Sequence, residues 1–374
     1  MDRTLTLRQL NRATLDRQIL VQRKAMSTPD VIDWLVGLQA QAAPAPYVGL
    51  WARIPELTRD DLASPIAERT VVKAAWIRGT LHLVTAADYV RHRSTLQPML
   101  TAGFESIAKR RGPAVDVPEV VAAARTYFAE APRTFAELSA WLTERYPDAD
   151  VGPLRHAVRM HLPIVQVPVD GGWSYPNKPQ FALADDWLDT TVPVEPSSPG
   201  AAADDAVDDL VRRYLRAFGP AGVTDLQTWS GMPAPALKDS LSRLRPELAT
   251  YRDEGRTELF DLADLALPDA DTPVPPRFLP EYDNVLLSHR KRTRIVADEH
   301  RRQVYLPGLR VAATILVDGF VAGTWKVSTA KGEATLAVEP FGRLTRADRA
   351  ALTADAEDLV RFVEPSAKSH AVRV

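Results

Sequence analysis

Two glutamines separated by one alanine, Gln39, Ala40 and Gln41, are the residues whose type and spacing say most about chemistry. They follow the apolar run 35–38 and precede Pro44, so we expect an amphipathic helix that ends in a turn carrying two carboxamides. A carboxamide is a poor general base, because it is not protonated in the useful pH range. It can hold a water molecule or an ester oxygen, since it offers both a donor and an acceptor. Such a pair suits a substrate that is already activated.

The sequence offers few other groups for catalysis. It has no Cys, which excludes disulfides, thiolate nucleophiles, Cys-ligated zinc and iron–sulfur clusters. His156 and His161 lie five residues apart, on different faces of a helix, and this is not the spacing of a zinc-binding helix. Ser288 and His289 are adjacent, whereas catalytic triads assemble through space, so we assign them no nucleophilic role. Neither a glycine-rich phosphate loop nor a dinucleotide fingerprint is present. We expect neither a metal nor a cofactor.

Basic residues gather in two regions, although the whole chain carries a formal charge of only −2. One group lies just ahead of a predicted strand, and the other lies on a predicted recognition helix and wing. Side chains of this kind contact phosphates without reading base sequence, although a charge run is more often a solvated face. The first group is His289, Arg290, Lys291, Arg292 and Arg294, and the second is Arg155, Arg159 and Lys178. We expect these residues to contact double-stranded DNA.

The predicted elements repeat in one order, in which helices are followed by a β-hairpin. This is the order of a winged helix, a fold used mainly to bind a duplex. The first copy has helices at 7–20, 28–38, 47–53 and 58–68 and strands at 71–76 and 80–84. The second has helices at 117–130, from 134, and at 152–162, with a wing over 164–183. The third has helices at 204–218, 224–230 and 234–244 and strands at 247–251 and 258–262.

These patterns predict an α+β protein of four units. Three tandem winged helices occupy residues 1–112, 113–191 and 204–272, and the stretch 192–203, rich in proline, serine and alanine, is interpreted as a linker. A β-rich domain follows at 273–374, with a hairpin over 310–327 and a closing helix at 346–364. The N-terminal segment lacks a signal-peptide apolar region, and no apolar run approaches membrane-spanning length. We therefore expect a cytoplasmic monomer without a membrane partner.

Five segments carry motifs that belong together. They are Asn-Arg-Ala at 11–13, Leu-Val-Gly-Leu-Gln-Ala-Gln at 35–41, Tyr-Val-Gly-Leu-Trp-Ala-Arg at 47–53, Arg-Gly-Thr-Leu-His-Leu-Val at 78–84 and Leu-Pro-Glu-Tyr-Asp-Asn-Val-Leu-Leu-Ser at 279–288. Together they resemble the AlkZ/YcaQ-type winged-helix DNA glycosylases, from the N-terminus to about the last strands. The resemblance implies three tandem winged helices and a C-terminal β-barrel in a C-shaped molecule, with DNA in the concave channel.

The resemblance also implies an activity, the excision of alkylated purines, including interstrand crosslinks formed at guanine N7. The family motif is Gln, an aliphatic residue, then Gln or Asp, and it falls on Gln39, Ala40 and Gln41. Gln at the last position is similar to the branch that gives resistance to natural products, and Ala40 is a small occupant of the middle position. In this interpretation the two carboxamides orient water and stabilise the positive charge that develops on the sugar. Arg78 and His82 would contact DNA from the adjacent hairpin.

No lysine lies near the motif in the sequence, so we expect a monofunctional glycosylase without lyase chemistry. Other interpretations stay open. Gln39 and Gln41 could simply cap a helix and satisfy turn backbone, and His82 could be an ordinary exposed strand residue. A non-catalytic winged-helix transcriptional regulator would favour a defined, often palindromic sequence and dimerise. A protein that sequesters the alkylating metabolite would protect DNA without producing abasic sites.

Overall fold

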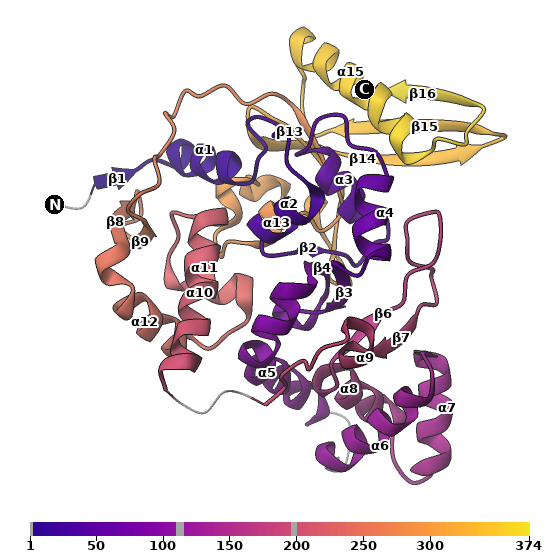
Figure 1. The fold of residues 1–374 in the computed structure, drawn as a ribbon. Coiled ribbons are helices and arrows are strands. Elements are labelled where there is room, and N and C mark those ends of the chain that lie inside the picture. Colours follow the sequence, from indigo (N-terminus) through magenta and orange to yellow (C-terminus); the bar gives the residue numbers. More distant parts are fainter. Residues whose placement is uncertain (1–2, 110–115, 196–199) are drawn as a thin grey trace.

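The computed structural model describes residues 3–109, 116–195 and 200–374, which form a mixed α+β fold (Figure 1). The first helices are α1 (Leu7–Arg17), α2 (Thr28–Trp34), α3 (Ala45–Trp51) and α4 (Asp60–Ala67). Helix α1 begins with a capping box, in which Thr6 and Gln9 satisfy each other's backbone amides. Ser27 caps α2 as the sequence predicts, with Pro29 in the first turn.

A six-stranded sheet lies at the centre of the molecule, in the order β2-β4-β3-β6-β7-β5 (Figure 1). Strands β2 (Leu38–Gln39), β3 (Val71–Ala75) and β4 (Leu81–Thr85) come from the first predicted unit. Strands β5 (Arg133–Thr134), β6 (Ile164–Gln166) and β7 (Gln180–Leu183) come from the second. One bridging pair, Ala74 with Val165, connects the two halves. The hairpins of two predicted units therefore form one sheet.

The longest helix, α5 (Ala86–Ala108), is missing from the sequence prediction. Thr85 caps it by accepting a hydrogen bond from the backbone amide of Asp88. The apolar residues of its buried side recur at helical spacing, and this pattern is visible in the sequence. It packs against both α8 and α10. The apolar residues of that side are Tyr89, Leu96, Leu100 and Phe104.

The second predicted unit contains α6 (Val117–Glu130), α7 (Phe135–Arg145), α8 (Val151–His161) and the short α9 (Ala184–Leu188). Its helices and strands enclose an apolar cluster that draws only on residues 120–183. Thr134 and Glu137 form the capping box that the sequence indicates for α7. This unit therefore has a core of its own.

The third predicted unit contains α10 (Ala201–Phe218), α11 (Val223–Ser230), α12 (Ala234–Arg243), β8 (Leu248–Asp253) and β9 (Glu258–Leu262). An unpredicted strand, β1 (Arg3–Leu5), pairs in parallel with β8. Tyr214, Phe218 and Trp229 share an apolar cluster with Trp76 and Tyr89 of the first unit. Of the predicted linker, residues 196–199 lie outside the described residues, and α10 already begins at Ala201.

The C-terminal region forms an open sheet in the order β10-β13-β14-β15-β16 (Figure 1). The strands are β10 (Arg277–Leu279), β13 (Thr314–Val317), β14 (Phe320–Ala330), β15 (Glu333–Pro340) and β16 (Ser369–Arg373). Helix α15 (Arg346–Val363) packs against β10, β15 and β16. Short elements connect them, namely α13 (Asn284–Leu287), α14 (Arg301–Val304), β11 (Tyr305–Leu306) and β12 (Arg310–Val311).

The prediction of a C-terminal β-barrel is wrong. Strands β10 and β16 are the two edges of this sheet and do not pair with each other, so no closed barrel exists within the described ranges. A helix covers apolar side chains of the sheet instead, with Leu352, Ala356 and Leu359 in the same cluster as Leu336 and Ile315. The hairpin around Asp318 and the closing helix, by contrast, lie where the sequence predicts them.

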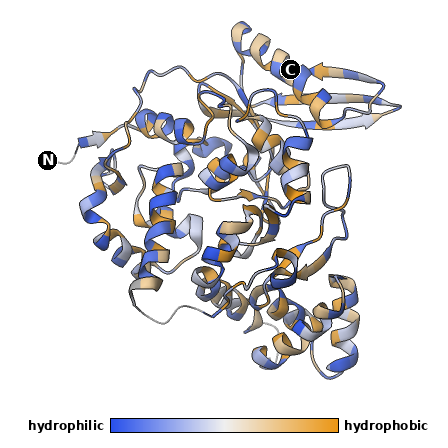
Figure 2. Cartoon of the chain, viewed as in Figure 1, coloured by the Kyte–Doolittle hydropathy of each residue, from blue (hydrophilic) through white to orange (hydrophobic). Residues whose placement is uncertain are grey.

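Figure 2 shows hydrophilic residues distributed along the longer helices, including α5 and α10. In the part of the chain that the structure describes, no helix combines the length and the apolar character needed to cross a bilayer.

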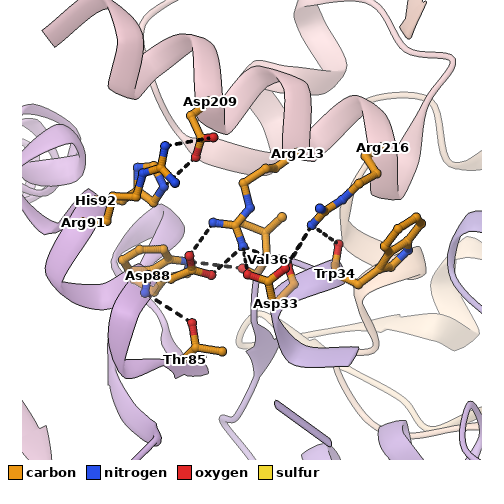
Figure 3. A network of polar contacts seen from close by, with 11 residues as sticks. Asp33, Trp34, Val36, Thr85, Asp88, Arg91, His92, Asp209, Arg213 and Arg216 are labelled. Atoms are coloured by element: carbon orange, nitrogen blue, oxygen red, sulfur yellow. Dashed lines mark hydrogen bonds and ion pairs between the residues drawn. The ribbon is translucent and has the colours of Figure 1, made fainter. Parts of the chain in front are cut away.

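A buried polar network joins α10 to α2 and α5 (Figure 3). The guanidinium of Arg213 donates to both carboxylate oxygens of Asp88, and its Nη2 donates to Asp33 Oδ1 over 2.7 Å. The side chains of Arg213 and Asp88 are only 9 % and 7 % exposed. Nearby, His92 Nε2 lies 2.9 Å from an oxygen of Asp209. The network therefore fixes α10 against the first unit through the buried pair of Arg213 and Asp88, while Asp33 is about half exposed.

Replacing Arg213 with alanine is expected to lower the free energy of unfolding by about 3–5 kcal/mol, because Asp88 would be left buried without its partner. The matched control is Arg212→Ala on the same helix. Arg212 also pairs with a carboxylate, Glu247, at 2.7 Å, but both side chains are at least 40 % exposed, so the loss should stay below about 1 kcal/mol. Urea unfolding of the two variants checks this. Similar losses would mean that burial does not determine the strength of these pairs.

Candidate active site

The glutamine motif lies on a strand and not on the helix that the sequence predicts. Helix α2 ends at Trp34, and Val36 and Gly37 then adopt positive φ angles of 58° and 99°. This left-handed turn leads directly into β2, where Gln39 pairs with His82 of β4. The prediction of a helix through residue 38 is therefore wrong for its last turn, because the chain leaves the helix to join the hairpin.

Two side chains hold the turn ahead of the motif. Trp76 Nε1 donates to the carbonyl of Val36 over 3.2 Å, and Asn284 Nδ2 donates to the carbonyl of Gly37 over 2.8 Å. A Cβ at residue 37 would meet the carbonyl oxygen of Leu83 at 3.0 Å, so both the φ angle and the space require glycine. Two of the five motif segments of the sequence analysis, 35–41 and 279–288, therefore meet at this turn.

Gln39 is fixed by an arginine of the adjacent turn. Arg78, in the 3-10 turn η1 (Ile77–Gly79), donates from Nη2 to Gln39 Oε1 over 2.8 Å and from Nη1 to the carbonyl of Trp229. Burial, with a smaller contribution from Arg292, lowers the pKa of Arg78 to about 10, so its guanidinium is still charged at neutral pH. Because a guanidinium only donates, the contact defines which atom of the amide is oxygen. The carboxamide is thus held in one orientation.

Gln41 is exposed, and its oxygen accepts a hydrogen bond from the backbone amide of Leu81 over 3.1 Å. The preceding residue, Ala40, donates to the carbonyl of Leu81 over 2.8 Å. The side chain of Gln41 therefore extends the β2–β4 ladder by one hydrogen bond and satisfies backbone, as one interpretation of the sequence expected. A carbonyl oxygen accepts two hydrogen bonds, so each glutamine oxygen keeps a second lone pair.

Gln41 lines a cleft with a volume of about 490 Å³. The walls carry three cationic side chains, and no Asp or Glu is among the described residues that line it. The cleft brings three residues of the sequence prediction together, namely Gln41, Arg159 of α8 and Lys178 of the wing. The other lining residues are Ala43, Lys73, Leu81, Thr134, Phe135, Ala136, Gln166, Tyr175, Pro176, Asn177, Pro179 and Phe181. An anion would enter this cleft with favourable electrostatics.

Lys73 was missed by the sequence analysis. Its side chain is 6 % exposed, and its Nζ lies 4.9 Å from the centroid of the Tyr175 ring. Burial lowers the pKa of Lys73 to about 8. No lysine lies near the motif in the sequence, but the fold places Lys73 in the same cleft as Gln41. No short-range sequence signal would have revealed it, since the contact depends on the pairing of the strands.

Gln39 and Lys73 point to opposite faces of the sheet. Residues paired directly across an antiparallel ladder share a face, and neighbours along a strand alternate. Gln39 pairs with His82, whereas Lys73 pairs with Leu83. Strand β2 ends at Gln39, and beyond it Gln41 lines the cleft together with Lys73, whereas Gln39 is held by Arg78.

The basic face continues along α8. Arg159 and Arg155 lie one turn apart and both line a second hollow of about 360 Å³, next to the first. Burial first, and then the charge of Arg155, lowers the pKa of Arg159. Arg155 is exposed, and its Nη1 lies 3.4 Å from Ser139 Oγ. These cations are accessible to a phosphate backbone.

Of the remaining residues that were predicted to contact DNA, some are buried and others are exposed. His82 is 1 % exposed, and burial lowers its pKa to about 3, so it is a neutral ring enclosed by protein. His289 and Arg294 are buried with their nitrogens 3.0 Å apart. The structure does not present these three side chains to DNA.

Between them, Arg290 and Lys291 are exposed, and Lys291 pairs with Asp253 at 2.9 Å. Arg292 is half-buried and lies 5.5 Å from the Tyr305 ring centroid. Two residues of the predicted run are therefore on the surface, where they lie apart from the cleft that contains Gln41.

Comparison with known proteins matches residues 32–362 to the family model of DNA glycosylase AlkZ-like proteins. The chain belongs to the AlkZ-like DNA glycosylase family. It is 24 % identical to the interstrand DNA cross-link repair glycosylase of Streptomyces sahachiroi, over 93 % of this chain and 94 % of that protein. The structure of Streptomyces sahachiroi DNA glycosylase AlkZ is similar to this fold with a TM-score of 0.78 and 22 % identity. That match covers 99 % of this chain and 100 % of the other.

Membership makes this AlkZ-like protein a DNA glycosylase, an enzyme that hydrolyses N-glycosyl bonds and acts on DNA. The alternative of a non-catalytic transcriptional regulator is not favoured. The resemblance found in the sequence is confirmed, and so is the α+β class of the fold.

Acid should destabilise the AlkZ-like fold through His82. The unfolded residue takes up a proton near pH 6.5, whereas the buried ring does so only near pH 3, so its contribution to stability is present above pH 6.5 and is lost as the pH falls below it. Between pH 7 and pH 5 we expect His82 to account for a loss of about 2 kcal/mol. Urea unfolding at both pH values should show a loss smaller by that amount in His82→Gln. An unchanged pH dependence would contradict the burial of this ring.

Proposed function

We propose that this glycosylase hydrolyses the N-glycosidic bond of N7-alkylated purines in double-stranded DNA, opens interstrand crosslinks formed at that position, and protects its producer against a DNA-alkylating natural product. We also propose that it acts as a monomer, with its three helix-and-hairpin units serving as winged helices around a C-shaped channel. The name of the Streptomyces sahachiroi relative, an interstrand DNA cross-link repair glycosylase, supports the crosslink substrate.

The chemistry of the lesion suits a site built from amides. Alkylation at N7 makes the purine cationic, so the base leaves as a neutral molecule and requires no strong general acid. The difficult steps are the formation of an oxocarbenium-like sugar and its capture by water. A carboxamide oxygen can orient that water and stabilise the developing charge.

The observation that carries the proposal is the position of Gln41 in a cationic cleft whose described lining contains no carboxylate. Arg159 and Lys178 supply charge for the phosphates on either side of a lesion, while Gln41 supplies a neutral amide at the reacting sugar. Gln39, fixed by Arg78, is the second amide of the motif. Because its oxygen faces Arg78, it can direct its NH₂ group or its second lone pair toward water at the strand edge.

Room for a bulky lesion lies beside the motif. A hollow of about 310 Å³ is lined by Ala42, Pro44 and Ala45, which follow Gln41 in the chain. Its lining also includes Trp173, Trp325, Val48 and Val327, with Glu281 and Glu364 among its polar residues. Aromatic walls of this kind can accept the apolar substituent of an adduct. Its position supports a substrate larger than a methylated base.

Loss of both amides should abolish most of the catalysis. We expect Gln39→Ala with Gln41→Ala to reduce the single-turnover rate of N7-methylguanine excision by roughly 100-fold or more, since orientation and electrostatics each contribute several kcal/mol. The rates of the Gln39→Ala and Gln41→Ala single variants show which of the two amides contributes more to catalysis. Thr353→Ala, a half-buried residue of α15 that does not line the cleft, is the control for preparation and folding. Equal rates for wild type and the double variant would remove the motif from the mechanism.

The cations of α8 should contribute to affinity through counterion release. Each phosphate contact contributes a slope of about −0.9 in a plot of log K against log salt concentration. Arg155→Ala with Arg159→Ala should therefore reduce the magnitude of that slope by about two, for damaged and undamaged duplex alike. Arg361→Ala, an exposed arginine of α15, is the control. Fluorescence anisotropy at several salt concentrations measures the slopes, and an unchanged slope would place the DNA elsewhere.

A further inference from the structure

Lys73 is an unusual lysine for a DNA-binding surface. Its side chain is almost fully enclosed, and its Nζ makes no hydrogen bond or ion pair with any residue that the structure describes. Its contact is the ring face of Tyr175, and it lines the cleft that also contains Gln41. The other ionisable groups of the described lining are Arg159, Lys178 and Tyr175. The amine therefore has no hydrogen-bond or ion-pair partner among the described residues, and it lines the same cleft as one amide of the motif.

A simple role as a phosphate anchor does not account for this burial. An anchor works through its charge, and burial opposes that charge by lowering the pKa of Lys73 to about 8, although most of the amine stays protonated at pH 7. At pH 7 roughly one molecule in eleven then carries a free amine, compared with roughly one in three thousand for a lysine with a pKa of 10.5. Desolvation of this kind is a recognised way to make a lysine nucleophilic. Arg159 and exposed Lys178 already supply permanent charge in the same cleft.

We propose that Lys73 is a catalytic nucleophile that forms an imine with the abasic sugar left in the cleft after base excision. This inference rests on the proposed function, because glycosidic hydrolysis supplies the aldehyde. It makes the enzyme bifunctional, in contrast to the expectation from the sequence.

The step balances without any further reactant. Lys73 Nζ forms a bond to C1′ of the ring-opened sugar, and the carbonyl oxygen leaves as water to give the imine. Loss of the C2′ proton to solvent then allows the bond between C3′ and its oxygen to break, and the 3′ strand departs with its phosphate as leaving group. Hydrolysis of the remaining imine returns the free amine.

The test uses the full-length protein with a duplex that contains a preformed abasic site. Sodium cyanoborohydride reduces an imine to a stable amine, so a covalent protein–DNA adduct should form with wild type, and mass spectrometry of the digested adduct should place the sugar on Lys73. An absent adduct, or one on a different lysine, would overturn the proposal. Mapping on wild type keeps the result independent of how any variant folds.

Charge-conserving variants separate nucleophile from cation. Lys73→Arg keeps a positive charge without a nucleophilic amine and should reduce the trapped adduct by about tenfold or more. Lys178→Arg makes the same change at the exposed lysine of the same cleft, and Lys326→Arg makes it in the neighbouring hollow; both should still form the adduct. An adduct lost in Lys178→Arg and retained in Lys73→Arg would overturn the assignment.

The pH profile gives a second readout. Trapping by wild type should rise about tenfold per pH unit from pH 6 and level off above about pH 8, where the amine is deprotonated. A profile that continues to rise toward pH 10 would indicate an ordinary exposed lysine and contradict the proposal. The duplex already contains the abasic site, so the trapping test does not depend on base excision. An absent adduct would contradict the role of Lys73 without contradicting the excision of N7-alkylated purines. Absent excision from an N7-methylguanine duplex would contradict the proposed substrate without affecting the trapping result.

Discussion

The pairing of the two-residue strand β2 with β4 is the interaction on which the site depends. The left-handed turn at Val36 and Gly37 brings the chain out of α2. The chain then forms β2, which pairs with β4 of the β3–β4 hairpin. The alternation of side chains along β3 and β4 then decides what each face presents. Gln39 joins Arg78 on one face, while the other face offers Lys73 to the cleft that Gln41 lines. A shift of one residue in this register would exchange the two faces.

Arginine supplies most of the 46 lysine and arginine residues of the chain, and it has a structural role as well as an electrostatic one. Several guanidinium groups are buried where elements distant in sequence meet, as in Arg17 with Asp261 and Arg53 with Asp283. Arg53 also donates to the carbonyls of Gln18 and Gly49, so one side chain connects three segments of chain. Arginine suits this role because its five donors spread in a rigid plane and its charge persists on burial. Much of the basic composition therefore stabilises the fold, and only an exposed subset is free to meet DNA.

Much of the fold could be predicted because most of its helices carry local sequence signals. Caps such as Ser27 and Thr134 and apolar spacing placed most helices within a few residues. Helix α5 was missed although its spacing was visible, and the barrel was predicted where α15 covers an open sheet. Of the site, the sequence supplied Gln41, Arg159 and Lys178, which the cleft brings together. Lys73 could not be predicted, because its role depends on strand register. His82, His289 and Arg294 looked like surface groups in sequence, but tertiary burial encloses them.

Strands β3 and β6 meet through one bridging pair, whereas β14 and β15 share eight. A junction with so few hydrogen bonds resists twisting only weakly, while each hairpin on either side keeps its own ladder intact. The cleft straddles this junction, with Lys73 on one flank and Gln166 on the other. A small rotation about the Ala74–Val165 pivot would widen or narrow the cavity without breaking either half of the sheet. The width of the cleft is therefore set where the six-stranded sheet has its fewest paired residues, so it can change there with the least loss of backbone hydrogen bonds.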